Sequence, residues 1–320
     1  MPAKIPVAIS RCLLGENVRY NGDHKHNRFC TGTLAEFFEF VPVCPEVAAG
    51  MPVPRKPIRL VLQPEGNVRA LESDDPNRDH TDAITRQADI FVQDNVMIAG
   101  FIATPNSPSC GTFGVKLYLP NGNPINKSVG VFSQRLQQLT PLLPIEETGR
   151  LNDPGLRENF IMRVYTYHRW LQLNQQPLTA KDLVAFHTRH KYLVMAHQPA
   201  AYKSLGQLVA QAGTVELETL ATTYIAQLMQ ALATPAPRHR HCNVLHHLMG
   251  YLKKWIATPD KQELLGTIEH YRQGVVPLIV PIALLRHHLE HWRDQQRYIL
   301  NQVYLNPYPY ELGLRSQVHP

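Results

Sequence analysis

No apolar run of about 18 residues, the length that a transmembrane helix needs, occurs in this 320-residue chain. The N-terminus lacks the layout of a secretory signal peptide, so we expect a cytoplasmic protein with no membrane partner. Cysteine is scarce and odd in number, because the chain has 5 widely spaced cysteines that do not suggest a disulfide framework. No internal repeat is visible. The few thiols are therefore expected to stay reduced.

Acidic residues are in short supply only in the second half of the chain, which has a formal net charge of +6. Residues 1–150 carry 15 Lys and Arg against 15 Asp and Glu, whereas residues 151–320 carry 17 against 11, with 13 of the 16 histidines. A neutral half followed by a basic half suggests that one part does chemistry and the other contacts a polyanion. Ordinary charge drift along the chain is the alternative.

The first half alternates strand-like and helical patterns, which favours βαβ units and a mostly parallel sheet. The expected strands are residues 5–10, 40–43, 58–63, 97–103 and 142–146, and the expected helices are residues 33–39, 80–95 and 130–139. Residues 63–79 are expected to form turns and loops. Acidic residues in and just after that segment either bind a cation or belong to a solvated loop that caps the next helix: Asp74, Asp75, Asp79 and Asp82.

The second half shows apolar residues at three- and four-residue spacing throughout, which predicts helices only. These helices are expected at residues 155–174, 180–198, 201–211, 215–232, 240–257, 260–273 and 279–300. The predicted fold class is an α/β domain with a mostly parallel sheet, followed by an all-α domain. We divide the chain into a catalytic domain (1–150), a connecting helical segment (151–185), a basic helical domain (186–305) and an irregular surface tail (306–320).

Three cysteines each follow the end of a predicted strand. Cys12 comes just after the first strand, Cys44 directly after the second, and Cys110 a few residues beyond the fourth. If these strands are parallel neighbours, their carboxyl ends meet at one edge of the sheet, where open α/β sheets place their sites. Three thiolates would then leave a bound iron or zinc with an open position. Buried, unrelated thiols are the alternative.

Polar residues lie close to these cysteines in the sequence. Glu46 lies two residues past Cys44, and Ser107 lies three residues before Cys110. A carboxylate and a hydroxyl beside a Lewis-acidic metal suit a step that activates water or delivers a proton. The simpler interpretations are that Glu46 lies at a helix N-terminus and that Ser107 forms a turn.

Four separated motifs occur in order: Ser10-Arg11-Cys12-Leu13-Leu14-Gly15, Val18-Arg19-Tyr20-Asn21-Gly22, Cys44-Pro45-Glu46 and Ser107-Pro108-Ser109-Cys110-Gly111. Together with Arg157-Glu158-Asn159-Phe160-Ile161, they make residues 5–170 resemble the thiouracil desulfidase family. The remainder, from His187 to Leu305, resembles the helical domain often fused behind desulfidases. Two-domain proteins of this kind look like tRNA 4-thiouridine desulfidases.

The resemblance implies a 4Fe–4S cluster held by Cys12, Cys44 and Cys110, with one open iron that binds the sulfur of a thiolated pyrimidine. It also implies acid–base and substrate-positioning roles for Glu46 and Ser107. Further candidates for positioning the cluster loop or the substrate come from the same motifs: Ser10, Asn21, Ser109 and Gly111. The implied reaction is hydrolytic and non-redox, because C=S and water give C=O and hydrosulfide.

The leading hypothesis is a desulfidase that converts 4-thiouridine in tRNA to uridine. A desulfidase acting on free thiouracil is the second hypothesis, and a non-catalytic iron–sulfur RNA binder or sensor is the third. The first and third require contacts with RNA phosphates and bases. The candidates for these contacts are basic residues of the helical half: Arg238, Arg240, Lys253, Lys254, His187 and Lys191. An amphipathic helix with a cationic polar face is the alternative. The oligomeric state is not predicted.

Two further cysteines leave alternatives open. Cys30 follows no strand and is either a packed thiol or a fourth ligand, which would close the cluster to substrate. Cys242 and His246 are one helical turn apart, a spacing that suits a metal ion. No carboxylate or second cysteine lies near them, which favours a basic, partly buried helix instead.

Overall fold

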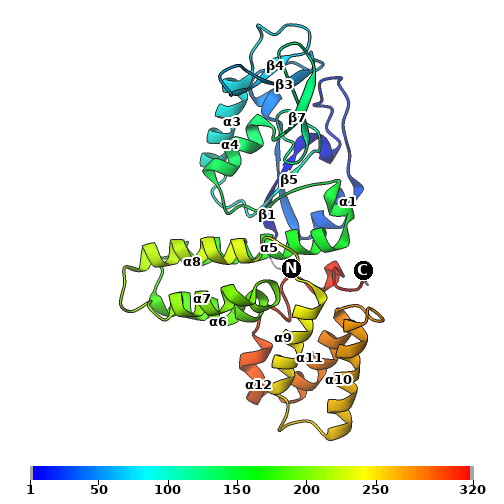
Figure 1. Cartoon of the computed structure of the whole chain (residues 1–320), viewed down its shortest axis with the longest axis vertical. Helices are drawn as coiled ribbons and strands as arrows, with labels where there is room; N and C mark the ends of the chain where they lie inside the picture. The colour runs from blue at the N-terminus through cyan, green and yellow to red at the C-terminus, as the bar shows by residue number, and fades with distance from the viewer. Residues whose placement is uncertain (1–2, 318–320) are drawn as a thin grey trace. The chain divides into compact units, whose positions relative to one another are not determined.

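The computed structural model describes residues 3–317 and forms two compact units, one ending at Asn152 and the other beginning at Asp153 (Figure 1). The first unit contains a parallel sheet with helices, and the second unit is helical. The predicted fold class is therefore confirmed. Within residues 3–317, no helix has the length and apolar character required to cross a membrane.

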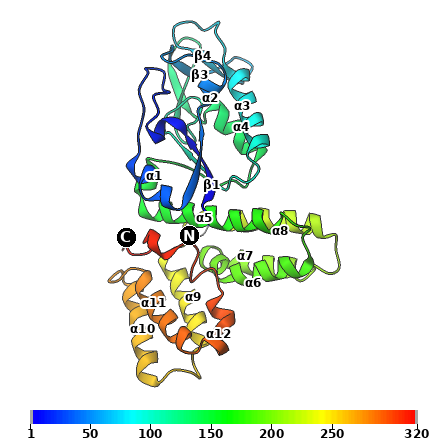
Figure 2. The ribbon, with the colours of Figure 1, turned by 180° about the vertical axis from the view of Figure 1, so that it is seen from behind.

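The parallel sheet of the first unit has the strand order β2-β1-β5-β8. Its strands are β1 (Ile5–Ser10), β2 (Phe38–Val43), β5 (Phe101–Ala103) and β8 (Ile145–Glu147). Helices α3 (Thr81–Asp94) and α4 (Val131–Leu139) lie side by side in both views (Figures 1 and 2). The ring of Phe132 in α4 lies 6.0 Å from that of Phe101 in β5, which anchors this helical layer on the sheet.

A second, mixed sheet has the order β4-β3-β6-β7. Its strands are β3 (Ile58–Leu62), β4 (Val68–Glu72), β6 (Val115–Tyr118) and β7 (Pro124–Ser128). The strand expected at 58–63 thus belongs to this sheet and not to the parallel one. The prediction that residues 63–79 form only turns and loops was wrong, because residues 68–72 pair antiparallel with β3.

The prediction of a helix at residues 33–39 was also wrong. Residues 34–36 form a single 3₁₀ turn, and β2 begins at Phe38, which pairs with Ile5 of β1. Sheet pairing with the buried first strand therefore prevails over local helical preference. Two short helices flank β2 in the sequence. Helix α1 (Arg28–Thr31) lies between β1 and β2, and α2 (Pro45–Ala48) follows β2.

The described residues of the second unit form eight α-helices and one short 3₁₀ helix, Tyr310–Leu312. The α-helices are α5 (Pro154–Leu173), α6 (Ala180–His197), α7 (Pro199–Val209), α8 (Leu217–Ala231), α9 (Arg238–Gly250), α10 (Thr258–Arg272), α11 (Ile279–His291) and α12 (Arg293–Leu300). The single helix expected at 279–300 is divided at Trp292. The core of the second unit includes Trp170, Phe186 and Tyr224, whose rings lie 5.3 to 6.3 Å apart.

The segment predicted as a surface tail is largely packed into the second unit. Tyr308, Leu312, Leu314 and Arg315 are buried, and the side chain of Arg315 forms an ion pair with Glu158 of α5 at 3.1 Å. Apolar and aromatic residues in this segment supply the burial, although its prolines prevent a long helix. The prediction for this segment was therefore wrong on its surface location.

Candidate active site

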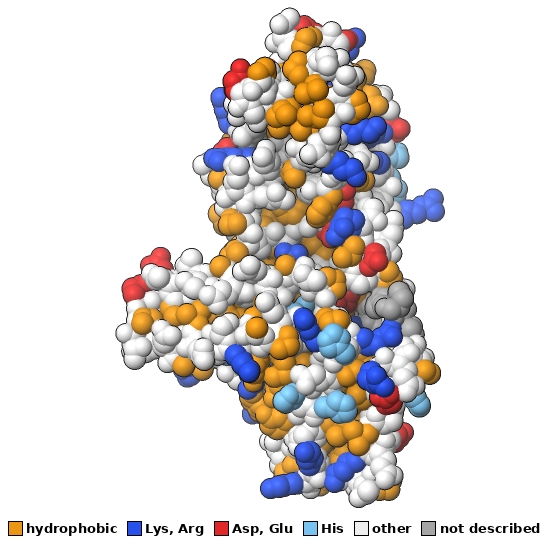
Figure 3. All heavy atoms as spheres, viewed as in Figure 1, with side chains coloured by type: hydrophobic (Ala, Val, Ile, Leu, Met, Phe, Trp, Pro, Cys, Tyr) orange, Lys and Arg blue, Asp and Glu red, His pale blue; other side chains and the backbone are white. Residues whose placement is uncertain are grey.

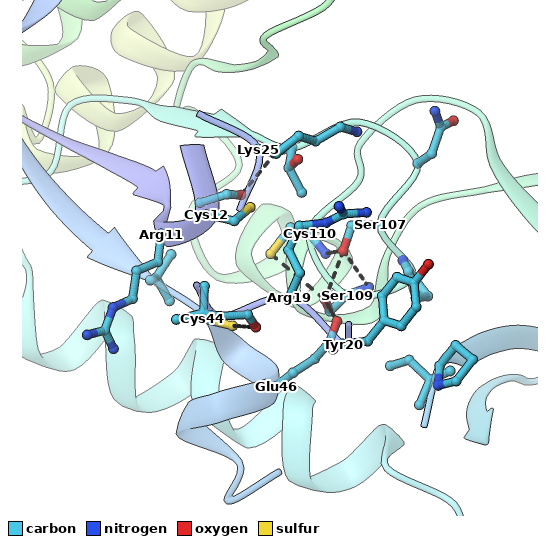
Figure 4. A pocket seen from close by; sticks show the side chains of 18 of the residues that line it. Arg11, Cys12, Arg19, Tyr20, Lys25, Cys44, Glu46, Ser107, Ser109 and Cys110 are labelled. Atoms are coloured by element: carbon cyan, nitrogen blue, oxygen red, sulfur yellow. Dashed lines mark hydrogen bonds between the residues drawn. The ribbon is translucent and has the colours of Figure 1, made fainter. Parts of the chain in front are cut away.

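Three thiols reach one cavity from three adjacent parallel strands. Cys12 lies in the 3₁₀ turn after β1, Cys44 follows β2 directly, and Cys110 lies in the loop after β5. All three line the same cavity of about 290 Å³ (Figure 4). The strand order β2-β1-β5 places these chain ends next to one another, as the position of each cysteine after a strand predicts.

The three thiols lie in an environment that disfavours their charged form. Burial raises the pKa of Cys12, Cys44 and Cys110, and the nearby Cys44 raises the pKa of Cys110 further. The cationic side chains of Arg19 and Lys25 lower the pKa of Cys12, but burial outweighs them. Three thiolates in this cavity therefore require a cation for charge compensation.

A chain of hydrogen bonds joins two serines to a carboxylate at the same cavity. The Ser109 hydroxyl donates to Glu46 Oε1 at 2.6 Å, and Ser109 Oγ lies 3.0 Å from Ser107 Oγ. Because Ser109 has one hydroxyl hydrogen and directs it at Glu46, Ser107 is the donor in the second contact. The chain therefore runs from Ser107 through Ser109 to Glu46 (Figure 4).

Arg55 holds the other carboxylate oxygen of Glu46, and the sequence analysis missed it. Its Nη2 and Nε lie 2.6 and 2.7 Å from Glu46 Oε2, and its side chain is only 4% exposed. Arg55 also donates to the backbone oxygens of Val18 and Pro52. The guanidinium thus fixes the orientation of Glu46 and ties it to the loop after Cys12. No local sequence pattern links Glu46 to an arginine nine residues later, so the ion pair could not be predicted from the sequence.

The loop that carries Cys110 is held by its own backbone. The Ser107 hydroxyl accepts hydrogen bonds from the N–H groups of Ser109 and Cys110, at 3.3 and 3.0 Å. The interpretation of Ser107 as a turn former is therefore correct in geometry, alongside its place in the hydrogen-bond chain. Glu46 likewise lies in the first turn of α2 as well as at the cavity.

Two glycines allow this loop to close. A Cβ on Gly111 would lie 2.5 Å from Val115 Cγ2 and 2.8 Å from the Ser107 carbonyl oxygen. A Cβ on Gly130 would lie 2.5 Å from both the carbonyl carbon and oxygen of Ser109. The Gly130 contact is with backbone, which cannot move away without displacing the serine loop. The sequence alone gave no sign of this contact.

Replacing Gly130 with alanine is expected to destabilise the first unit by about 1–3 kcal/mol, because the new methyl group overlaps the Ser109 backbone. Gly149→Ala is the matched control, since a Cβ there would meet nothing within 4 Å. Hydrogen exchange of β1 and β5 amides measures the loss of stability. Equal protection in the two variants would contradict this account of the loop.

The remaining candidates of the cluster loop divide into two groups. Ser10 lines the cavity, and Gly111 lies just behind it, where its N–H donates to the Ser107 carbonyl oxygen at 2.8 Å. Asn21 is exposed and does not line the cavity, so the structure does not bring it to the thiols. Arg19 and Tyr20, from the same motif, line the cavity instead.

Neither of the other two candidate cysteines, Cys30 and Cys242, lines the thiol cavity. Cys30 is fully buried on α1, does not line the cavity, and has its pKa raised to about 12 by burial, as expected for a packed thiol. Cys242 is buried, whereas His246 on the same helix is exposed. Among residues 3–317, no three His, Cys, Asp or Glu side chains are placed to hold a single metal ion. The acidic loop instead forms ion pairs, such as Lys56 with Asp74 at 2.6 Å.

The candidate RNA contacts in the second unit differ in accessibility. His187 is buried, its ring lies beside Tyr224, and burial lowers its pKa to about 4, so it is not a surface residue. Arg240 donates to the backbone oxygen of His197, and Arg238 lies over the Tyr271 ring. Both arginines are partly buried.

Three of the predicted basic residues lie near exposed aromatic residues, in sequence or in space. Lys253 and Lys254 are exposed in the turn after α9, two and three residues after the exposed Tyr251. The Tyr251 ring lies 6.0 Å from that of Tyr298, and Lys191 Nζ lies 5.2 Å from the Tyr298 ring. We call these five residues the aromatic–basic surface. Lys, Arg and His side chains also gather over α9 to α12 on the face shown in Figure 3.

Comparison with known proteins finds a match to a different family model in each unit. Residues 7–148 match the family model of 2-thiouracil desulfurase, and residues 191–309 match that of a protein family of unknown function, DUF1722. The chain is also similar to the uncharacterized protein YbgA of Escherichia coli, with 28% identity over 159 residues, which cover 49% of this chain and 93% of YbgA. Among solved structures, the [4Fe–4S]-dependent thiouracil desulfidase TudS aligns at 25% identity, over 47% of this chain and 95% of TudS, with a TM-score of 0.37.

Proposed function

We propose that this chain is an iron–sulfur desulfidase that converts 4-thiouridine in tRNA to uridine, because residues 7–148 match the family model of 2-thiouracil desulfurase. The observation that carries the proposal is the shared cavity, where three thiols, two of them buried, meet a carboxylate and two serines. The net reaction consumes water and the C4=S group and yields C4=O and hydrosulfide. No electron is gained or lost in this balance.

The thiols fit a [4Fe–4S] cluster. Cysteine thiolates are the usual ligands of such clusters, and all three thiols line one cavity. Cys12, Cys44 and Cys110 would hold the cluster. When bound, it would supply a thiophilic Lewis acid for the substrate sulfur.

The residues around the cavity are arranged to move a proton. Glu46 Oε1 receives the hydrogen bond of Ser109, which in turn receives that of Ser107. A proton taken from water beside Ser107 can reach Glu46 through Ser109 without entering bulk solvent, and it can return by the same route to the departing sulfide. Arg55 keeps the carboxylate oriented throughout.

Tyr20 offers a surface for the pyrimidine itself. Its ring is 43% exposed and lines the cavity on the segment after Cys12. An exposed aromatic face at a cavity rim suits stacking of an unpaired base. 4-Thiouridine would have to unstack from the tRNA to reach it, at a cost of about a few kcal/mol.

The aromatic–basic surface of the second unit supports RNA as the substrate. Exposed lysines supply phosphate contacts, and adjacent tyrosine rings supply stacking contacts. The excess of basic over acidic residues lies in this half of the chain. A free thiobase carries no phosphate and gains nothing from such a surface.

The proposal is tested by anaerobic reconstitution of the full chain, followed by mass analysis of nucleosides from thiolated tRNA. We expect loss of 4-thiouridine, gain of uridine and release of sulfide. If free thiouracil were converted while the tRNA stayed unchanged, the proposal would be wrong and the chain would be a desulfidase of the free base. Cluster uptake without sulfide release from either substrate would make the chain a non-catalytic binder.

The double variant Lys253→Glu/Lys254→Glu is expected to lower kcat/KM for thiolated tRNA and to leave that for free thiouracil unchanged. With about three phosphate contacts, raising salt from about 50 to 200 mM should weaken tRNA use by roughly 20- to 40-fold in the wild type, and by less in the variant. Lys181→Glu is the control, because Lys181 is exposed at the start of α6 and lies outside the aromatic–basic surface. If both variants lost the same share of kcat/KM for tRNA, the aromatic–basic surface would not be the RNA contact.

A further inference from the structure

Thr104 carries a buried hydroxyl that the protein does not satisfy. It follows β5 directly, is only 9% exposed and lines the thiol cavity, yet its Oγ1 has no hydrogen-bond partner. A buried hydroxyl without a partner destabilises the folded protein, because it has lost its hydrogen bonds to water. Such a group at a functional cavity indicates that its partner is bound there during function.

Ser10 holds Thr104 in place and keeps its own hydrogen available. Parallel pairing of β1 with β5 brings Ser10 beside Thr104, and Ser10 Oγ accepts the Thr104 backbone N–H at 3.0 Å. Since this contact uses a lone pair of the Ser10 oxygen, the hydroxyl hydrogen of Ser10 remains free to donate. Ser10 is 1% exposed and lines the same cavity.

The acceptors available in this cavity are cysteine sulfurs. Cys12, Cys44 and Cys110 line the same cavity as the hydroxyls of Ser10 and Thr104. A sulfur bound to iron carries negative charge, and outer-shell hydrogen-bond donors commonly stabilise such ligands.

We propose that Thr104 and Ser10 are positioning residues that donate O–H···S hydrogen bonds to the cysteine sulfurs that hold the cluster in this cavity. The proposal rests on the iron–sulfur cluster of the proposed function. These bonds withdraw negative charge from the ligand sulfurs. They thereby raise the reduction potential of the cluster and slow its loss.

The test is Thr104→Val, which keeps the shape of the side chain and removes only the hydroxyl. Because the hydroxyl has no partner in the metal-free protein, the metal-free variant should be as stable as the wild type or more stable. After reconstitution, its cluster should have a more negative reduction potential and lose iron to a chelator about 10- to 100-fold faster. Neither readout requires substrate or turnover.

Two further variants separate the hydrogen bond from simple packing. Thr104→Ser retains a hydroxyl and should restore the potential, whereas Thr148→Val, at a buried threonine that does not line the cavity, should change neither readout. Ser10→Ala should also shift the potential to more negative values. A Thr104→Val cluster with wild-type potential and wild-type iron loss would overturn the proposal, while normal cluster uptake would leave the proposed function standing.

Discussion

Replacing Glu46 with glutamine is expected to lower the rate of desulfuration by about two to four orders of magnitude, with the iron and sulfide content of the reconstituted protein unchanged. Glutamine has the shape of glutamate but cannot take up a proton from Ser109. The hydrogen-bond chain would therefore end at a group that neither receives nor returns a proton. Single-turnover rates with thiolated substrate, alongside iron and sulfide analysis, measure the two effects separately.

Glu146→Gln is the matched control for this experiment. Glu146 is another buried carboxylate of the first unit and pairs with Arg150 at 2.7 Å, but it does not line the cavity. Its replacement also removes a buried carboxylate from an ion pair, here with an arginine side chain that is 41% exposed, and should leave turnover close to that of the wild type. If Glu46→Gln kept near-normal turnover, Glu46 would have no part in proton transfer.

Replacing Arg55 with methionine is expected to destabilise the first unit by about 3–5 kcal/mol, because it leaves the Glu46 carboxylate buried without its counter-ion. The two side chains are only 4% and 12% exposed, so water cannot take over the role of the guanidinium. Turnover should fall as well, since Glu46 loses the contact that orients it. All 3 tryptophans lie beyond residue 153, so their fluorescence does not report this unit. Hydrogen exchange of β1 and β5 amides does report it.

The double variant Glu46→Gln/Arg55→Met separates stability from catalysis. Removing both charges eliminates the unpaired carboxylate, so much of the lost stability should return, although the Arg55 hydrogen bonds to Val18 and Pro52 stay lost. Turnover should remain as low as in Glu46→Gln alone. A double variant as unstable as Arg55→Met would show that the two side chains are not energetically coupled.

Much of the candidate site was predictable because its ingredients are local. Short buried runs followed by Cys12 and Cys44 predict strands with a thiol at the carboxyl end. Parallel pairing then brings those ends together regardless of the distance between them in sequence. The helical half was predictable for the same reason, since apolar spacing within one helix is visible without knowledge of its neighbours.

The second sheet was only partly predictable. In β7 (Pro124–Ser128) most side chains are exposed, so no alternation of apolar and polar residues marks it as a strand. It exists because its backbone pairs with β6. His187 is the opposite case. The sequence suggests an exposed basic residue, but in the structure His187 is buried beside Tyr224.

The sequence by itself determined the strands of the parallel sheet, the helical character of the second half, the three thiols at strand ends, and the contrast between a neutral and a basic half. These properties depend on residues close together in the chain or on totals over it. Only the tertiary structure decided that Arg55 pairs with Glu46, that Ser109 links Ser107 to that carboxylate, and that Gly130 leaves room for the serine loop. Each of these contacts joins segments that are brought together only by the packing of the whole unit. A local sequence pattern therefore cannot predict them.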